Sequence, residues 1–126
     1  GGSLARLLHA EGATLVIADK EDDKTPHTVA AKAEALKSEL GEGVTTALSS
    51  EIHKQDVDVY APCAMGACLD DNTIPEIKAK YVIGAANNQL AEARHGKMLH
   101  DAEKIYVPDF IANAGGVIAV GMEVKH

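Results

Sequence analysis

The chain has 126 residues, enough for one domain with a buried core but too few for two ordinary domains. Hydrophobic residues make up 46% and charged residues 25%, which excludes a chain that is disordered throughout. The formal net charge of -7 argues against a nucleic-acid surface, which needs clustered lysine and arginine.

Membrane and secretory features are not found in the sequence. No segment has the roughly 20 apolar residues of a membrane helix. The first residues do not follow the charged, apolar and cleavage-site pattern of a secretory signal. The two cysteines, Cys63 and Cys68, are too few for a disulfide scaffold, so a reduced, cytoplasmic setting is expected.

Helical and extended patterns alternate along the chain. Leu4, Leu7 and Leu8 fall at helical spacing, and Gly12 is expected to end that helix. Further helices are expected over residues 25–40, 73–79 and 92–102, with one helical turn over 49–54. Strands are expected over residues 14–18, 44–48, 57–60, 80–84 and 104–107. Asn113 is expected to cap a last helix that runs from Ala114 towards Val124.

This alternation is typical of βαβ units, and it predicts an α/β fold. Right-handed crossovers then give a doubly wound parallel sheet with helices on both faces. Such a sheet normally begins with a strand in its middle, whereas this sequence opens inside a helix at Gly1. The first strand is therefore expected to be missing, and residues 1–126 are expected to form one partial domain.

Asp19 closes the first predicted strand, 18 residues after Gly1. In dinucleotide-binding folds a glycine-rich turn holds the pyrophosphate at a helix N-terminus, and an acidic residue about 20 positions later binds the ribose hydroxyls. The spacing fits if Gly1 is the last glycine of that turn. An acid at this place would repel a 2'-phosphate, which favours NAD over NADP. The alternative is that Asp19 is only a turn residue after a strand.

Three loops of similar character follow predicted strands, at residues 63–66, 85–88 and 113–116. They combine small residues, which let a flat ring approach the backbone, with side-chain amides that donate and accept hydrogen bonds. Ligands of open α/β sheets bind beyond the carboxyl ends of the strands. Each loop alone is better explained by turns and tight packing, but the three together favour a binding site.

The cysteines and histidines do not form a metal or nucleophile motif. Zinc needs about four ligands at characteristic spacings, and no histidine lies near Cys63 or Cys68 in the sequence. Both cysteines are expected to be small buried residues. His95 and His100 are five residues apart and do not share a helix face, so they are expected to be surface or packing residues. No metal site and no catalytic residue is predicted within this chain.

Five segments resemble, in the same order, the NAD-binding domain of the leucine/phenylalanine/valine dehydrogenases, a group that also includes glutamate dehydrogenase. They are residues 1–5 (GGSLA), 15–19 (LVIAD), 61–66 (APCAMG), 84–88 (GAANN) and 108–116 (PDFIANAGG). The resemblance implies a Rossmann-like sheet and NAD as cofactor. It also implies oxidative deamination of an L-amino acid to a 2-oxo acid and ammonia, by an enzyme that is a homo-oligomer when complete.

The resemblance also implies roles for particular residues. Asp19 would bind the adenosine ribose of NAD, with Gly1 at the phosphate-binding turn. The residues implied to contact the rest of the cofactor are Ala64, Met65, Ala85, Ala86 and Asn87. Asn87 would also touch the amino acid. Val117 and Val120 would line the pocket for the substrate side chain, which favours leucine, valine or isoleucine over phenylalanine; the alternative is that both simply pack against the sheet.

The family's catalytic lysines and acid belong to a separate N-terminal domain with a glycine-rich lysine motif that this sequence does not contain. The isolated chain is therefore expected to be an inactive fragment that binds NAD poorly. Two alternatives stay open. One is a glutamate-type or other NAD-linked dehydrogenase, and the other is a nucleotide-binding module without catalysis.

Overall fold

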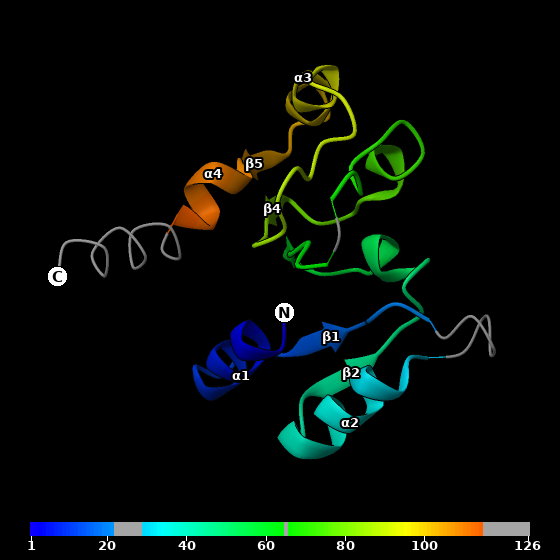
Figure 1. Cartoon of the computed structure of the whole chain (residues 1–126), viewed down its shortest axis with the longest axis vertical. Helices are drawn as coiled ribbons and strands as arrows, with labels where there is room; N and C mark the ends of the chain where they lie inside the picture. The colour runs from blue at the N-terminus through cyan, green and yellow to red at the C-terminus, as the bar shows by residue number, and fades with distance from the viewer. Residues whose placement is uncertain (22–28, 65, 115–126) are drawn as a thin grey trace, which may run out of the picture. The chain divides into compact units, whose positions relative to one another are not determined.

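The computed structural model describes residues 1–21, 29–64 and 66–114 (Figure 1). The chain divides into two compact units, Gly1–Gln55 and Asp56–His126. All five predicted strands are present in the described residues, and every pairing between them is parallel. The chain is therefore an α/β protein with parallel sheets. None of the described helices is long and apolar enough to cross a membrane.

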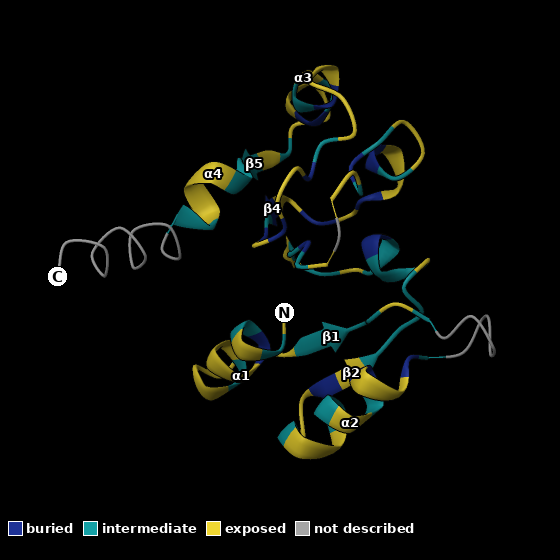
Figure 2. Ribbon diagram, viewed as in Figure 1, coloured by how far each residue is buried: buried dark blue, intermediate teal, exposed yellow. Residues whose placement is uncertain are grey.

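The first unit is a βαβ arrangement preceded by a helix. Its elements are α1 (Gly2–Ala10), β1 (Leu15–Ile17), α2 (Ala31–Leu40), β2 (Val44–Thr46) and the 3-10 turn η1 (Ile52–Lys54). β1 pairs with β2 in parallel, with Leu15 opposite Val44. Parallel neighbours require a crossover connection, which α2 supplies. Figure 2 shows that α1 and α2 expose most of their surface, and their buried residues are the alanines Ala5 and Ala33.

Glycines end both helices of this unit, as the sequence predicts. Gly12 and Gly41 take φ angles of +90° and +80°, which L side chains adopt only under strain. The start of the second helix differs from the prediction, because Ala30 is extended (φ -60°, ψ 136°) and the helix begins only at Ala31. The predicted start of this helix, including Pro26, lies outside the described residues.

The second unit contains a three-stranded sheet, and α3 lies in the connection between its strands β4 and β5. Its elements are β3 (Val59–Tyr60), the 3-10 turn η2 (Ile74–Glu76), β4 (Tyr81–Ile83), α3 (Arg94–Asp101), β5 (Ile105–Val107) and α4 (Asp109–Ala112). The strand order is β3-β4-β5. No pairing among the described residues joins this sheet to β1 and β2, so the predicted single sheet with a missing first strand stays a prediction.

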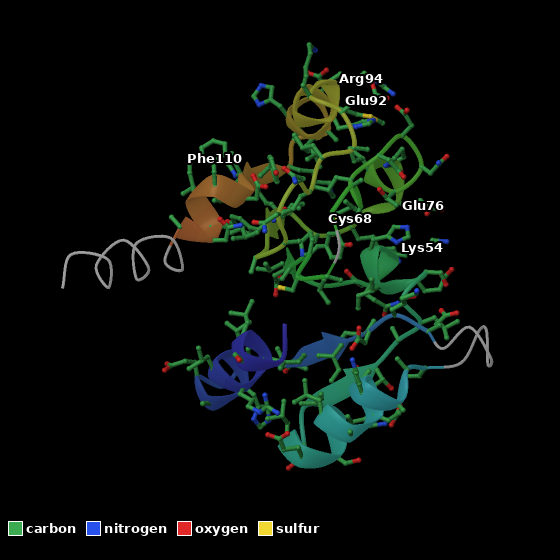
Figure 3. All side chains as sticks on the ribbon, in the orientation of Figure 1. Lys54, Cys68, Glu76, Glu92, Arg94 and Phe110 are labelled. Atoms are coloured by element: carbon green, nitrogen blue, oxygen red, sulfur yellow. The ribbon has the colours of Figure 1, made fainter. Side chains whose placement is uncertain are left out.

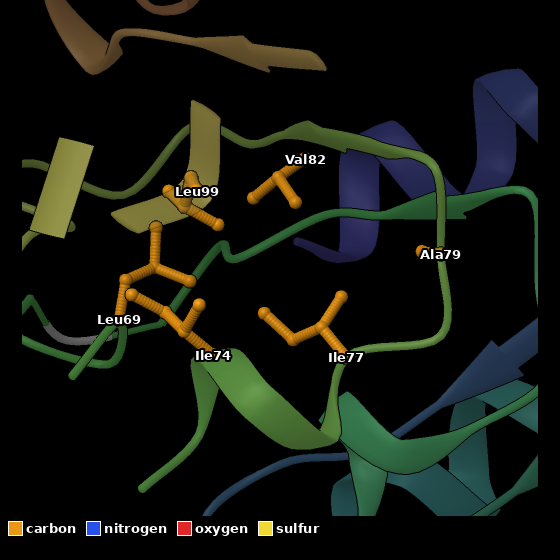
Figure 4. Close-up of a cluster of buried hydrophobic side chains, with 6 residues drawn as sticks. All are labelled: Leu69, Ile74, Ile77, Ala79, Val82 and Leu99. Atoms are coloured by element: carbon orange, nitrogen blue, oxygen red, sulfur yellow. The ribbon is translucent and has the colours of Figure 1, made fainter. Parts of the chain in front are cut away.

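One side of this sheet carries the core. Val82 of β4 is fully buried and packs with five other apolar side chains (Figure 4): Leu69, Ile74, Ile77, Ala79 and Leu99. Side chains of a strand alternate between its faces. Tyr81, the residue before Val82, is accordingly exposed, and so are its partners in register on the neighbouring strands, Val59 and Ile105.

One predicted helix of this unit is shorter in the structure: residues 73–79 form only the 3-10 turn η2, because Ile77 is extended. The single helical turn predicted over residues 49–54 is present as η1. Asn113 follows α4, which Pro108 precedes, and the next residue, Ala114, is again helical. Phe110 projects from α4 (Figure 3) and is exposed. The rest of the predicted last helix lies outside the described residues.

Candidate functional site

Hydrogen bonds join the loop after β4 to the loop after β3 on one side and to Asn113, which follows α4, on the other. On one side the backbone N–H of Ala86 donates to the Pro62 carbonyl (3.0 Å), and that of Ala67 donates to the Asn88 carbonyl (2.7 Å). On the other side the Asn113 side-chain amide donates to Oδ1 of Asn87 at 2.5 Å. The structure thus brings together residues that the sequence placed on three separate loops.

Two glycines permit this close approach. A Cβ atom on Gly66 would lie 2.6 Å from the Asn87 carbonyl oxygen, and one on Gly84 would lie 2.1 Å from the Pro62 carbonyl oxygen. Real Cβ atoms do not approach other atoms so closely, so both positions require glycine for packing. Gly84 does not take a positive φ, so packing alone explains its lack of a side chain. The sequence left open whether Gly66 serves tight packing or ligand binding, and its contact with the Asn87 carbonyl supports tight packing.

A hollow of about 500 Å³ opens beside these loops. Its lining combines small side chains with two amides: Ala64, Gly66, Ala67, Asn87, Asn88, Leu90 and Ala91. Ala64 and Asn87, both predicted site residues, therefore line one surface. Ala85 is exposed, whereas the Ala86 side chain is only 4% exposed and turns into the protein. Met65, Val117 and Val120 lie outside the described residues.

Gln89 is a buried polar residue that the sequence reading missed. It is only 1% exposed, and its Nε2 donates to the carbonyls of Gly84 (2.8 Å) and Ala86 (3.0 Å). In the described part of the chain its Oε1 has no hydrogen-bond partner. The Gln89 side chain thus stabilises the turn after β4. No spacing rule marks such a residue, because its partners are carbonyls three and five positions before it.

The other predicted cofactor residues lie in the first unit. Gly1 precedes α1 and accepts the Ala5 amide through its carbonyl (2.9 Å), as the residue before a helix does. The first turn of α1 has no acidic residue and no side-chain cap, so its free N–H groups suit an anion. Asp19 follows β1 and is partly exposed, with Oδ1 accepting the Lys20 amide at 2.8 Å.

His95 has a structural role at the start of α3. It is 1% exposed, and the backbone N–H of Glu92 donates to its Nδ1 at 2.9 Å. In the neutral ring the proton then sits on Nε2, which lies 3.6 Å from Asp71. Arg94 pairs with both Asp71 and Glu92 beside it (Figure 3). His95 is thus a packing residue, as predicted, while His100 is exposed.

Burial around β3 keeps two ionisable groups neutral. Burial raises the pKa of the Tyr60 hydroxyl, and the neighbouring Cys68 raises it further. Burial also raises the pKa of the Cys68 thiol, which disfavours the thiolate needed for nucleophilic or metal chemistry. Within residues 1–21, 29–64 and 66–114, no group of three or more His, Cys, Asp or Glu side chains is arranged to hold a metal ion.

Comparison with protein families matches residues 7–126 to the family described as Glutamate/Leucine/Phenylalanine/Valine dehydrogenase. Leucine dehydrogenase from Bacillus subtilis (strain 168) is 42% identical over 122 residues, which are 97% of this chain and 31% of that protein. Phenylalanine dehydrogenase from Lysinibacillus sphaericus is 40% identical over 124 residues, 98% of this chain and 31% of that protein.

A solved structure is also similar. The crystal structure of L-tryptophan dehydrogenase from Nostoc punctiforme matches with a TM-score of 0.86 and 39% identity, over 98% of this chain and 34% of the other. The chain thus spans about a third of the length of the proteins it matches.

Proposed function

The chain belongs to the glutamate/leucine/phenylalanine/valine dehydrogenase family, and from this premise we propose that it is the NAD-binding part of an amino-acid dehydrogenase. The observation that carries the proposal is the hollow lined by Ala64, Gly66 and Asn87 at the carboxyl ends of parallel strands. Ligands of open α/β sheets bind at such an edge. The proposed fold is a Rossmann-like sheet in which residues 1–126 are a partial domain lacking the first strand.

The residues present fit NAD in three respects. The free N–H groups at the start of α1, after Gly1, suit the pyrophosphate. The carboxylate of Asp19 has one oxygen with no hydrogen-bond partner among the described residues, and this oxygen suits a ribose hydroxyl. The small residues Ala64, Gly66 and Ala67 line the hollow of about 500 Å³ beside Asn87, and small residues suit the approach of a flat ring.

In this proposal each group has a binding or orienting task. NAD, when bound, supplies the hydride acceptor, and the chemistry of transfer belongs to the cofactor. Asp19 selects NAD over NADP by its charge. The backbone at Ala85 and Ala86 borders the nicotinamide end, with Met65 on the cofactor and the Asn87 amide contacting the amino acid. No catalytic acid or base comes from this chain.

The proposed substrate is an aliphatic L-amino acid, which becomes a 2-oxo acid and ammonia. Val117 and Val120 are three residues apart, so on a helix they share one face and form a stiff aliphatic wall. This favours leucine, valine or isoleucine over phenylalanine. The matched leucine and phenylalanine dehydrogenases support the class of substrate. We further propose a cytoplasmic enzyme that is a homo-oligomer when complete.

The test compares the complete enzyme, meaning the longer protein proposed to carry this chain, with the 126-residue chain alone. The complete enzyme is expected to reduce NAD in the presence of leucine, valine or isoleucine. The chain alone is expected to show no turnover, because it lacks a catalytic lysine or acid. A complete enzyme that binds NAD but turns over none of these amino acids, or glutamate only, would contradict the proposal. Turnover by the chain alone would contradict the proposal that the catalytic residues lie outside this chain.

A further inference from the structure

Asp109 links the end of β5 to the loop that presents Asn87. We infer that Asp109 is a positioning residue: through the backbone of Asn88 it fixes the direction in which Asn87 faces the hollow. This inference rests on the proposed function of that loop. Asp109 itself is not among the residues predicted to contact the cofactor or the substrate.

The carboxylate of Asp109 is committed to two backbone donors. Its Oδ1 accepts the N–H of Phe110 at 2.9 Å, and its Oδ2 accepts the N–H of Asn88 at 2.5 Å. Asp109 is the first residue of α4, where a negative side chain is favoured by the helix dipole. Hydrogen bonds to a carboxylate are shorter and stronger than those between neutral groups. The side chain therefore holds its two partners at a fixed separation.

The hydrogen bond to the Asp109 carboxylate fixes the backbone conformation of Asn88. Its φ angle is +51°, in the left-handed region, which asparagine adopts more readily than other non-glycine residues. Both of its backbone groups are occupied: its N–H donates to Asp109, and its carbonyl accepts the N–H of Ala67 at 2.7 Å. These two hydrogen bonds hold Asn88 in this one of the conformations open to asparagine. Without the Asp109 carboxylate, one of the two bonds that hold Asn88 in this conformation is lost.

A change at Asn88 reaches Asn87 directly. The two residues share a peptide unit, and both line the hollow. The Oδ1 atom of Asn87 accepts a hydrogen bond from Asn113, which follows α4, so the same helix holds the loop at a second point. The Asn87 amide is exposed, and nothing else in the described structure hydrogen-bonds to its side chain. Its direction therefore depends on Asn113 and on the backbone that Asp109 holds.

The first test uses two variants of the complete enzyme. Asp109→Asn keeps the side-chain size but leaves only one oxygen for two donors. Asp109→Ser keeps an acceptor near Phe110 but is too short to reach Asn88. Both are expected to lower kcat by about 10- to 100-fold, the cost of misplacing a reacting group by about 1 Å. The KM for NAD is expected to change by less than about threefold, because neither Gly1 nor Asp19, the proposed contacts of the pyrophosphate and the ribose, hydrogen-bonds to Asp109.

Asp101→Asn is the matched control, because it removes a surface carboxylate of the same type. Asp101 pairs with Lys97 on the exposed side of α3, away from the loop. This variant is expected to keep the wild-type kcat. If Asp109→Ser keeps the wild-type kcat, or if both Asp109 variants lower only the melting temperature, Asp109 serves α4 alone and the inference is overturned.

A second measurement does not depend on catalysis. In NMR spectra of the complete enzyme, labelled selectively at asparagine side chains, Asp109→Asn is expected to shift the side-chain amide signals of Asn87 and Asn113, and Asp101→Asn is not. Unchanged Asn87 signals in Asp109→Asn would overturn the inference. If the wild-type complete enzyme shows no NAD-dependent activity, the proposed function fails, and the NMR comparison still decides the role of Asp109.

Discussion

Gly84 lies against Pro62 so closely that a Cβ atom on Gly84 would be 2.1 Å from the Pro62 carbonyl oxygen and 2.5 Å from its nitrogen. Gly84 directly follows β4, and Pro62 lies two residues after the end of β3. The same Pro62 carbonyl accepts the N–H of Ala86 at 3.0 Å. Contact between these two loops therefore depends on a missing side chain, and the atoms in the way are backbone atoms that cannot rotate aside.

The first prediction follows from this contact. Gly84→Ala is expected to lower the free energy of unfolding by more than about 2 kcal/mol, because the loops must separate to admit the methyl group. Gly96→Ala is the control: its Cβ would meet only Leu90 Cδ1, at 3.5 Å, and alanine gains up to about 1 kcal/mol within a helix. Urea denaturation measures both. Equal stability of Gly84→Ala and the wild type would show that the loops tolerate the separation.

The second prediction concerns acid stability and Asp70. Its Oδ1 accepts the backbone N–H groups of Thr73 and Asn72, each at 2.8 Å, and the bond from Thr73 does most to lower its pKa below the usual 3.8. A carboxyl whose pKa is lower in the folded state stabilises the fold above its unfolded pKa. That contribution is lost as the pH falls through the folded pKa.

Asp70→Asn is therefore expected to be less stable than the wild type near neutral pH, by a gap that narrows as the pH falls below about 4. Urea denaturation at a series of pH values measures the gap. Some acid sensitivity will remain in the variant, because Arg94 lowers the pKa of Asp71 and Glu92 as well. A gap that stays constant across the series would mean that Asp70 contributes nothing through its charge.

The third prediction concerns cofactor choice in the complete enzyme. Asp19→Ala is expected to weaken NAD binding by about 1–3 kcal/mol, the usual cost of losing a charge-assisted hydrogen bond. It is also expected to narrow the preference for NAD over NADP. Calorimetric titration with both cofactors measures the effect, with Asp56→Ala, an exposed acidic residue outside the proposed site, as control. A wild type that already uses NADP equally well would remove the role given to Asp19.

The fourth prediction concerns the substrate. Val117→Ala in the complete enzyme is expected to raise the ratio of kcat/KM for phenylalanine to that for leucine, because a smaller wall leaves room for a ring. The change is expected to be modest, because one methylene group of fit is worth about 1–3 kcal/mol. Initial rates with both amino acids give the ratio. If it is unchanged, Val117 faces away from the substrate.

Local pattern was enough to place the strands. The aliphatic runs that contain β1 and β4 are short, buried in part and bounded by glycine or polar residues, and the structure has strands at both. The same local reading placed α2 too early and gave residues 73–79 a full helix, because an extended Ala30 and an extended Ile77 depend on surroundings that composition does not record.

In the candidate site, too, some residues were predicted from the sequence and others were not. Ala64 and Asn87 belong to two loops that the sequence places after strands, the resemblance implies their roles, and both line the hollow. Asp109 and Gln89 were missed. Asp109 is 21 residues from its partner Asn88, and the partners of Gln89 are carbonyl groups, which every residue has. Only the folded backbone brings such groups within reach, so the sequence did not reveal these contacts, although Asp109 lies in the segment 108–116 that carries the resemblance.

The exposed row of Val59, Tyr81 and Ile105 has a practical consequence for handling the 126-residue chain. Their side chains are 47%, 38% and 45% exposed and stand next to one another on three adjacent strands. An exposed apolar row of this kind promotes self-association. Repulsion between chains with a net charge of -7 opposes this association, and salt screens that repulsion. Self-association is therefore expected to be weakest in dilute, low-salt buffer, and Tyr81→Lys is expected to reduce it in concentrated samples.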